Sequence, residues 1–231
     1  ANLDPRGMLY PGWVEREVMR LRWAKEQGAR GLKIYKALGL GFRDPDGARV
    51  KVDDPRLDPI FEECGLLGLV VDIHTGDPKA FFEPLGPQNE RFEELRANPG
   101  WSFHGPGFPT WEELFGEYER RVARHPGTRF IGIHFCNAPE QPGRVAQMLR
   151  RYPNLYVDTA ARLGEIGRQP RETLRTIFLE HHDRILFGTD FSLAGDEMML
   201  GAPDGTLPTA ADADRFFALH WRFFETLERP I

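Results

Sequence analysis

The connections between helical patterns and short apolar runs have two distinct lengths, and this asymmetry constrains the fold more than any other feature. Turns from a helix into the next apolar run are short, as at 28–30 and at Gly68. Connections out of the apolar runs are long, at 37–54, 75–110 and 191–211. Alternating helices and strands predict right-handed βαβ units and a parallel sheet. The long segments then gather at the carboxyl ends of the strands, where both α/β barrels and doubly wound sheets build their sites, so the pattern indicates an enzyme.

Apolar spacing locates the individual elements. Helices are expected over 11–27, 55–67 and 111–124, and further helices around 145–149, 174–178 and 216–227. Strands are expected over 31–36, 69–74, 129–134, 154–158 and 184–188. Gly28 suits a left-handed stop at the end of the first helix.

Length and charge exclude several classes of protein. The chain has 231 residues, 41% of them hydrophobic, which fits one ordered domain over residues 1–231. The net charge of −5 and the absence of a Lys/Arg run exclude nucleic acid and anionic membranes as partners, and no apolar run is long enough to span a bilayer. Two cysteines, Cys64 and Cys136, form no disulfide framework, and they weakly favour a reducing, cytoplasmic location.

Three predicted strands end in metal-ligating residue types. His74, His134 and Asp190 each follow an apolar run, so they are expected to share the carboxyl-terminal mouth of the sheet. Imidazole nitrogen and carboxylate oxygen suit a divalent metal such as zinc, which lowers the pKa of bound water to about 7. A single histidine at a strand end is more often structural, but three such residues at equivalent positions favour a site.

Two other polar residues near this mouth, Lys36 and Arg162, each have more than one interpretation. Lys36 is either an anion contact, or a modified-lysine ligand, or a solvated lysine at a strand end. Arg162 either clamps a substrate carboxylate bidentately or forms a structural ion pair. Asp158 lies where it could reach the mouth, whereas Asp72 is expected in a core network.

The remaining histidines are weaker candidates. His104 lies in an aromatic segment, 101–109, which is either a lid with substrate contacts or a self-packed surface loop. The others are expected to be structural: His125, His181, His182 and His220.

Four ordered motifs resemble the amidohydrolase superfamily, in the branch that includes aminocarboxymuconate-semialdehyde decarboxylase. They are Gly-Leu-Lys-Ile-Tyr-Lys at 31–36, Asp-Ile-His-Thr-Gly-Asp-Pro at 72–78, Ile-Gly-Ile-His-Phe-Cys-Asn at 131–137 and Phe-Gly-Thr-Asp-Phe at 187–191. The resemblance implies a (β/α)8 barrel of the TIM type. It also implies a divalent metal, zinc first and manganese second, held by His74 and Asp190.

The same resemblance assigns the reacting groups. It implies that His134 is the catalytic acid and base beside the metal, with Asp190 able to assist it. Substrate contacts are expected from Lys36, Arg162 and Asn137.

The sequence departs from the family pattern in one respect. A His-x-His pair ends the family's first strand, and no His-x-His occurs in this chain. Ala1–Asp4 resemble the end of strand three, so the chain is expected to carry roughly strands four to eight of the barrel. Five strands cannot close an eight-stranded barrel.

The predicted function is a metal-dependent hydrolase that acts on a small organic acid, ester, amide or lactone through metal-activated water. The first alternative is a metal-dependent decarboxylase, a carbon–carbon lyase on the same scaffold. The second is a non-catalytic truncated remnant. The partner is a small-molecule substrate, and self-association into a homo-oligomer is left open.

Overall fold

Five strands form a parallel sheet whose spatial order follows the chain. The computed structural model describes residues 1–194, 197–200 and 208–225. Every neighbouring pair in the sheet is parallel, which confirms the predicted α/β arrangement. In order the strands are β1 (Gly31–Ile34), β2 (Val70–Ile73), β3 (Phe130–Gly132), β4 (Leu155–Asp158) and β5 (Ile185–Leu186).

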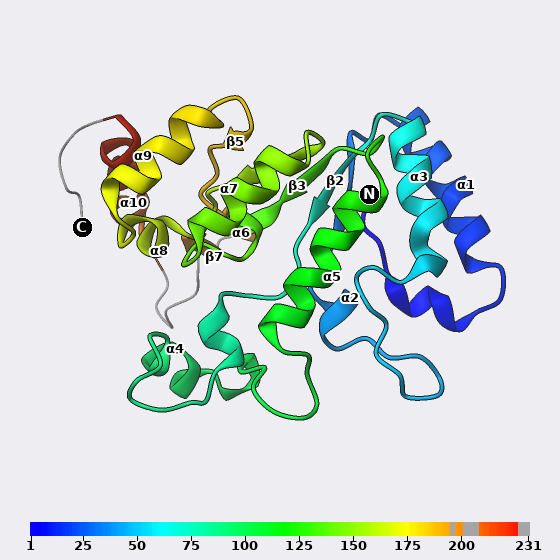
Figure 1. Ribbon diagram of the computed structural model, residues 1–231, viewed down its shortest axis with the longest axis horizontal. Helices are drawn as coiled ribbons and strands as arrows, with labels where there is room; N and C mark the ends of the chain where they lie inside the picture. The colour runs from blue at the N-terminus through cyan, green and yellow to red at the C-terminus, as the bar shows by residue number, and fades with distance from the viewer. Residues whose placement is uncertain (195–196, 201–207, 226–231) are drawn as a thin grey trace.

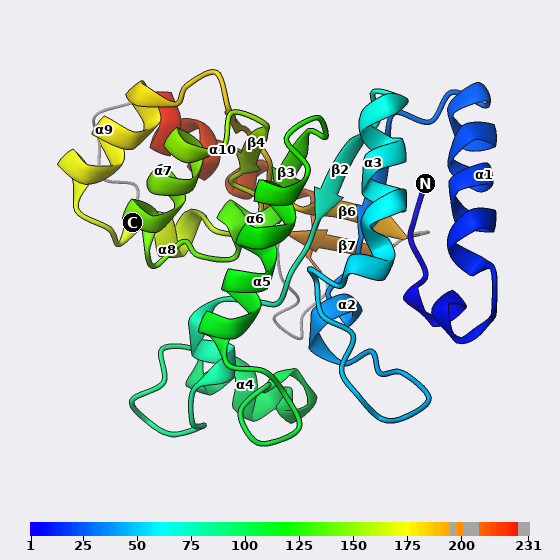
Figure 2. The same ribbon diagram turned by 45° about the vertical axis from the view of Figure 1, so that its right-hand side comes forward.

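The long helices lie along one face of this sheet (Figures 1 and 2). Strand residues alternate between a buried apolar side and a half-buried side, as in β1, where Leu32 is fully buried and Lys33 is not. On the half-buried face Lys33 of β1 lies opposite Asp72 of β2. The helices are α1 (Trp13–Glu26), α3 (Asp58–Leu66), α5 (Trp111–Arg124), α7 (Pro142–Arg151) and α9 (Arg171–Glu180).

Local signals explain where these helices begin and end. Thr110 and Glu113 form a capping box at the start of α5, each side chain accepting from the other residue's backbone. Gly28 follows α1 with a φ of 92°, as its position in the sequence predicted.

Three segments predicted as loops contain short elements. Segment 37–54 contains α2 (Ala37–Leu40), and segment 75–110 contains α4 (Phe92–Ala97) between two turns of 3₁₀ helix (Lys79–Phe82 and Pro99–Trp101). These elements are too short to show a helical period in the sequence. Segment 191–211 contains an antiparallel hairpin of β6 (Phe191–Ala194) and β7 (Glu197–Leu200). Other short elements are α6 (Ile133–Cys136), α8 (Leu163–Gly167) and the 3₁₀ turns Pro5–Leu9 and Pro55–Leu57.

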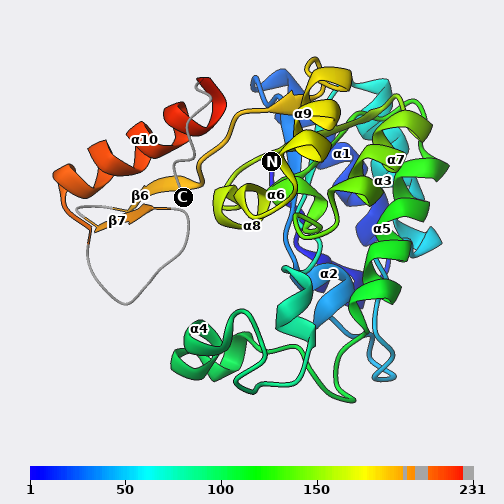
Figure 3. The same cartoon turned by 60° about the vertical axis from the view of Figure 1, so that its left-hand side comes forward.

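The last helix, α10 (Ala210–Glu225), lies with the β6–β7 hairpin to one side of the sheet (Figure 3). Aromatic contacts join the hairpin to α10, and α10 to Phe187 after β5. The rings of Phe191 and Phe217 are 5.6 Å apart, and those of Phe187 and Trp221 stack at 4.9 Å. None of the described helices combines the length and apolar character that a bilayer-spanning segment needs.

The first residues extend the sheet beyond β1. Asn2 forms a parallel bridge with Lys33, and the Leu3 amide donates to the Lys33 carbonyl at 2.9 Å. Whether this segment is the end of a third barrel strand stays a prediction. Within the described residues, β5 forms the other end of the sheet.

Candidate active site

Two histidines from adjacent strands meet at the carboxyl-terminal edge of the sheet. His74 follows β2, and its amide continues the ladder by donating to the Ile34 carbonyl at 3.0 Å. His134 follows β3, and its ring meets the His74 ring edge to face with centroids 4.6 Å apart. The structure therefore brings these two predicted site residues together. Burial lowers the pKa of both imidazoles, that of His134 to about 2, so both are neutral at physiological pH.

Directly after β3 the backbone passes through consecutive residues in the left-handed region. The φ angles of His134, Phe135, Cys136 and Asn137 are 58°, 57°, 57° and 50°. For residues that carry a Cβ, this conformation costs roughly 1–2 kcal/mol each. Backbone strain of this kind gathers at functional sites and needs compensating contacts. Asp190 also has a positive φ, of 59°.

Asp158, at the end of β4, supplies such contacts. Its Oδ1 accepts the amide of His134 at 2.8 Å and the amide of Ala160 at 3.1 Å. The Ala160 carbonyl lies 2.8 Å from His134 Nδ1. Because a carbonyl only accepts, Nδ1 carries the proton and Nε2 keeps its lone pair. Burial raises the pKa of Asp158 to about 6.

Asp77 is a buried carboxylate that the sequence reasoning missed. The Lys36 ammonium donates to its Oδ2 at 2.7 Å, and Arg162 Nη2 and His74 Nε2 each lie 3.9 Å from its Oδ1. Burial raises the pKa of Asp77, but nearby His74 and Lys36 more than offset this, and the net pKa lies below its usual value. Asp77 is therefore ionised, and Lys36 is neither a free anion contact nor a wholly solvated lysine. A carboxylate in the same loop as His74 was the available signal.

Arg162 lies beside this carboxylate and is almost completely buried. Only 9% of its side chain is exposed, and burial lowers the pKa of its guanidinium. Its Nη1 donates to the Ala161 carbonyl at 2.8 Å, while its Nε has no hydrogen-bond partner among the described residues. The 3.9 Å contact with Asp77 is longer than a hydrogen bond. The geometry thus leaves donor capacity on Arg162, as the carboxylate-clamp interpretation requires.

Several buried polar atoms of the two histidines, their loops and the surroundings of Arg162 are likewise unsatisfied within the described part of the chain. Asn137 donates through Nδ2 to the Thr75 carbonyl at 3.1 Å, but its Oδ1 has no partner. Because buried polar groups are normally hydrogen-bonded, unsatisfied ones call for a ligand or water. The atoms concerned are His74 Nε2, Thr75 Oγ1, Asn137 Oδ1, both carboxylate oxygens of Glu140, and Arg162 Nε.

Asp190 follows β5, close enough to His74 and Arg162 for both to act on its charge. Burial raises its pKa, and these two residues partly oppose the rise. The donor chemistry of His74 and Asp190 fits a divalent cation, and His74 Nε2 is buried without a partner, as an unliganded metal donor would be. The described residues nevertheless place no group of three or more His, Cys, Asp or Glu side chains around one point.

The segment 75–110 forms a lobe next to this edge (Figure 1). Its aromatic residues pack on one another, with the Phe103 ring 5.5 Å from Phe82 and 5.3 Å from Phe108. His104 Nδ1 lies 3.1 Å from the Phe82 carbonyl. These contacts support the interpretation of a self-packed loop for His104, although the Lys36 ammonium lies 5.6 Å from the centroid of Phe103.

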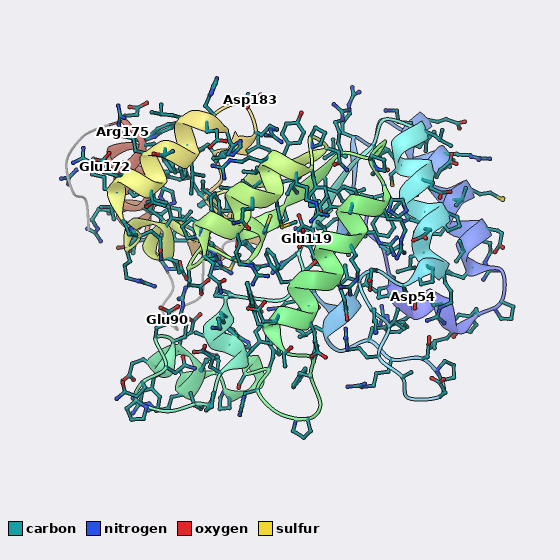
Figure 4. All side chains as sticks on the ribbon, in the orientation of Figure 1. Asp54, Glu90, Glu119, Glu172, Arg175 and Asp183 are labelled. Carbon is teal, nitrogen blue, oxygen red and sulfur yellow. The ribbon has the colours of Figure 1, made fainter. Side chains whose placement is uncertain are left out.

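Ion pairs fasten the lobe to α8. Arg91 of the lobe pairs with Glu165 of α8, whose side chain is only 2% exposed. Glu90, on the side of the lobe nearest α8 in Figure 4, lies 3.5 Å from Arg168. Because α8 directly follows Arg162, these contacts fix the lobe close to the buried guanidinium.

The remaining histidines lie outside the site, as predicted. His125 ends α5 at the amino-terminal side of β3, and its Nδ1 lies 3.0 Å from the Arg121 carbonyl. His220 is buried, and its Nδ1 lies 2.8 Å from the Phe216 carbonyl oxygen of the same helix. His181 and His182 follow α9, in the turn that also contains Asp183 (Figure 4).

Comparison with known families agrees with the predicted resemblance. A family model described as Amidohydrolase matches residues 7–219. A search of curated proteins gives no match.

Solved structures give likenesses of fold at low sequence identity. Dihydroorotase from Saccharomyces cerevisiae, in complex with 5-fluoroorotic acid, is 14% identical with a TM-score of 0.50, over 99% of this chain and 62% of that one. 2,6-Dihydroxybenzoate decarboxylase from Rhizobium is 22% identical with a TM-score of 0.47, over 77% of this chain and 56% of that one. An uncharacterised TIM-barrel protein from Bordetella bronchiseptica is 18% identical with a TM-score of 0.44, over 76% of this chain and 49% of that one.

The chain thus spans about half of the length of the Bordetella bronchiseptica protein and less than two thirds of each of the other two. Together with the family match, the likeness to dihydroorotase shows an α/β fold of the (β/α)8 type. The described strands β1 to β5 are consecutive parallel strands of that fold.

Proposed function

Because this chain belongs to the amidohydrolase family, we propose that it acts as a metal-dependent hydrolase on a small organic acid that carries an ester, amide or lactone bond. Members of the superfamily generally use divalent metals. The observation that carries the proposal is the gathering of buried, unsatisfied polar atoms around the neutral His74 and His134 rings. Such a concentration at one strand edge is typical of a binding and reaction site.

His74 and Asp190 are the proposed metal ligands, with zinc as the first candidate and manganese as the second. A bound divalent cation would polarise the scissile carbonyl and lower the pKa of a water molecule to about 7.

His134 is the proposed acid and base. With its proton on Nδ1, its Nε2 can accept a proton from the attacking water and return it to the leaving group. Because burial keeps the imidazole neutral, the lone pair is available throughout the physiological pH range. Asp190 is the alternative acceptor for the same proton.

Arg162, Asn137 and Lys36 are the proposed substrate contacts. Arg162 retains donor capacity in a buried position and would bind a carboxylate group of the substrate. Asn137 Oδ1 would accept a hydrogen bond from an N–H or O–H group elsewhere on the substrate. An ammonium has three N–H donors, so Lys36 would donate to the substrate while it keeps its bond to Asp77. A cation fixed on a carboxylate stabilises the charge that decarboxylation removes, so this arrangement favours hydrolysis over loss of that carboxylate.

The test is turnover by the purified protein with its metal content measured. We expect near-stoichiometric divalent metal by elemental analysis, and hydrolysis within a panel of carboxylate-bearing esters, amides and lactones. Release of carbon dioxide from unsaturated carboxylates, without hydrolysis, would instead identify the decarboxylase. If no metal is found, and added zinc or manganese yields no turnover of any substrate, the proposal is wrong.

A further inference from the structure

The histidine proposed as acid and base is held at two points by the end of one neighbouring strand. The Asp158 carboxylate accepts the His134 amide at 2.8 Å, and the Ala160 carbonyl lies 2.8 Å from the His134 ring nitrogen Nδ1. Asp158 also accepts the Ala160 amide at 3.1 Å. The carboxylate therefore connects the backbone of His134 to the acceptor of its ring proton.

This connection compensates for the unusual backbone that follows β3. The amide of His134 leaves the regular strand geometry because His134 and the three residues after it are left-handed. Without Asp158 this amide would lose its carboxylate acceptor in a buried position, which is unfavourable. The contact thus helps to select the strained conformation over an ordinary continuation of the strand.

Burial of Asp158 disfavours the charged form of its carboxyl group. Burial raises its pKa, and Asp72 of β2 adds to the rise. The hydrogen bonds from the His134 and Ala160 amides and the charge of Lys33 of β1 oppose it without cancelling it. Tyr118 of α5 and Cys136 of the left-handed turn also face its charge, and burial raises the pKa of both so that they are uncharged.

We propose that Asp158 is a positioning residue, which fixes the His134 imidazole in the Nδ1-protonated tautomer with Nε2 directed to the reaction. This inference rests on the proposed role of His134. Asp158 itself transfers no proton and touches no reacting atom. Its carboxylate orders the loop that holds Nδ1–H, so that the Nε2 lone pair is always the one available to take a proton from water.

The test combines nuclear magnetic resonance with kinetics. Long-range ¹H–¹⁵N correlation of histidine-labelled protein, with the His134 signals assigned from their loss in His134→Gln, reports the tautomer directly. We expect the Nδ1–H form alone in the wild type and a mixture of tautomers in Asp158→Ala. We also expect kcat to fall by about 10- to 100-fold with KM nearly unchanged. Asp158→Asn, which keeps an acceptor oxygen, should recover part of both losses.

Asp72→Asn is the matched control, because Asp72 is a half-buried strand carboxylate whose pKa is also raised by burial and whose partner in β3 is Ile131 rather than His134. It should leave the tautomer and kcat unchanged. A wild-type Nε2–H tautomer, or an Asp158→Ala variant with the wild-type tautomer, would overturn the inference.

Two further measurements keep the outcomes separate. If Asp158→Ala does not fold, hydrogen exchange of the His134 amide provides the test. We expect slow exchange in the wild type and faster exchange in Asp158→Asn. Rapid exchange in the wild type would contradict the proposal. If the wild type turns over no substrate, the proposed function has failed, while the tautomer measurement still decides the role of Asp158.

Discussion

The imidazole rings of His74 and His134 meet edge to face, with their centroids 4.6 Å apart and their planes at 84°. The two residues are far apart in the sequence and come together because β2 and β3 are parallel neighbours. Their contact defines the centre of the candidate site, with Asp77 and Arg162 beside it.

Replacing His134 should affect the chemical step. Removing the group that moves the proton costs about 10²- to 10⁴-fold in general acid–base catalysis. We therefore expect His134→Ala to lower kcat by at least about 100-fold, with KM changed by only a few-fold. Steady-state kinetics on the best substrate of the panel measures this. His104→Ala is the control, since His104 lies in the self-packed lobe, and equal effects of the two variants would contradict the assignment.

Arg162 should govern recognition of the substrate carboxylate. A hydrogen bond to a charged group contributes about 1.5–3 kcal/mol, so Arg162→Met should raise KM for a carboxylate-bearing substrate by about 10- to 100-fold. A neutral analogue without the carboxylate provides the internal comparison and should show little change. A similar loss with both substrates would mean that Arg162 has a structural role.

The acid limb of the activity profile should belong to Asp158. Because burial lowers the pKa of His134 to about 2, that ring does not titrate near neutrality. Burial raises the pKa of Asp158 to about 6, so protonation below that pH weakens its bonds to the amides of His134 and Ala160. We expect kcat to fall as the pH drops through about 6, and Asp158→Asn to abolish this step. An unchanged limb in the variant would refute the assignment.

The raised pKa of Asp158 makes the free energy of unfolding fall as the pH rises, whereas activity is expected to rise with pH. In the folded state the pKa of Asp158, about 6, lies above its ordinary value of 3.8, so the native state binds an extra proton between these two pH values. This group therefore stabilises the fold most at the acid end, and its contribution is lost as the pH rises through about 6. Asp158→Asn should remove this dependence from the free energy of unfolding.

Gly132 should tolerate no side chain. A Cβ at this position would collide with Cys136 Sγ and would lie 2.7 Å from the Tyr118 hydroxyl, both of them buried. Overpacking of this kind costs about 1–3 kcal/mol, so Gly132→Ala should lower the free energy of unfolding by that amount in urea titrations. Gly127→Ala, with open space around its Cβ, is the control. Equal stability of the two variants would contradict the packing described here.

Regular elements could be predicted from the sequence because their apolar period is long enough to be seen. The helix over 111–124 was predicted within these bounds, since it has a complete amphipathic stripe and a capping box. The hairpin β6–β7 and the short helices α4 and α8 were not predicted. They owe their conformation to contacts such as the pair of Arg91 and Glu165, which no local pattern reveals.

The site could be predicted in part for the same reason. Parallel strands place His74 and His134 at one edge, whatever the details of the loops. The left-handed turn after β3 could not be foreseen, because four residues with a Cβ adopt it only with tertiary contacts such as that from Asp158. Asp77 was overlooked although it lies in the same loop as His74, and its importance became evident only from its contacts with Lys36 and Arg162.

Cobalt(II) binding tests whether His74 and Asp190 hold a divalent metal. Titration of the protein with cobalt(II), followed by its visible absorption, reports both the stoichiometry and the ligands. The account predicts one equivalent bound by the wild type and by the His104→Ala control, and loss of the absorption in His74→Ala and Asp190→Asn. Absence of binding to the wild type, or the same spectrum in all four proteins, would contradict it.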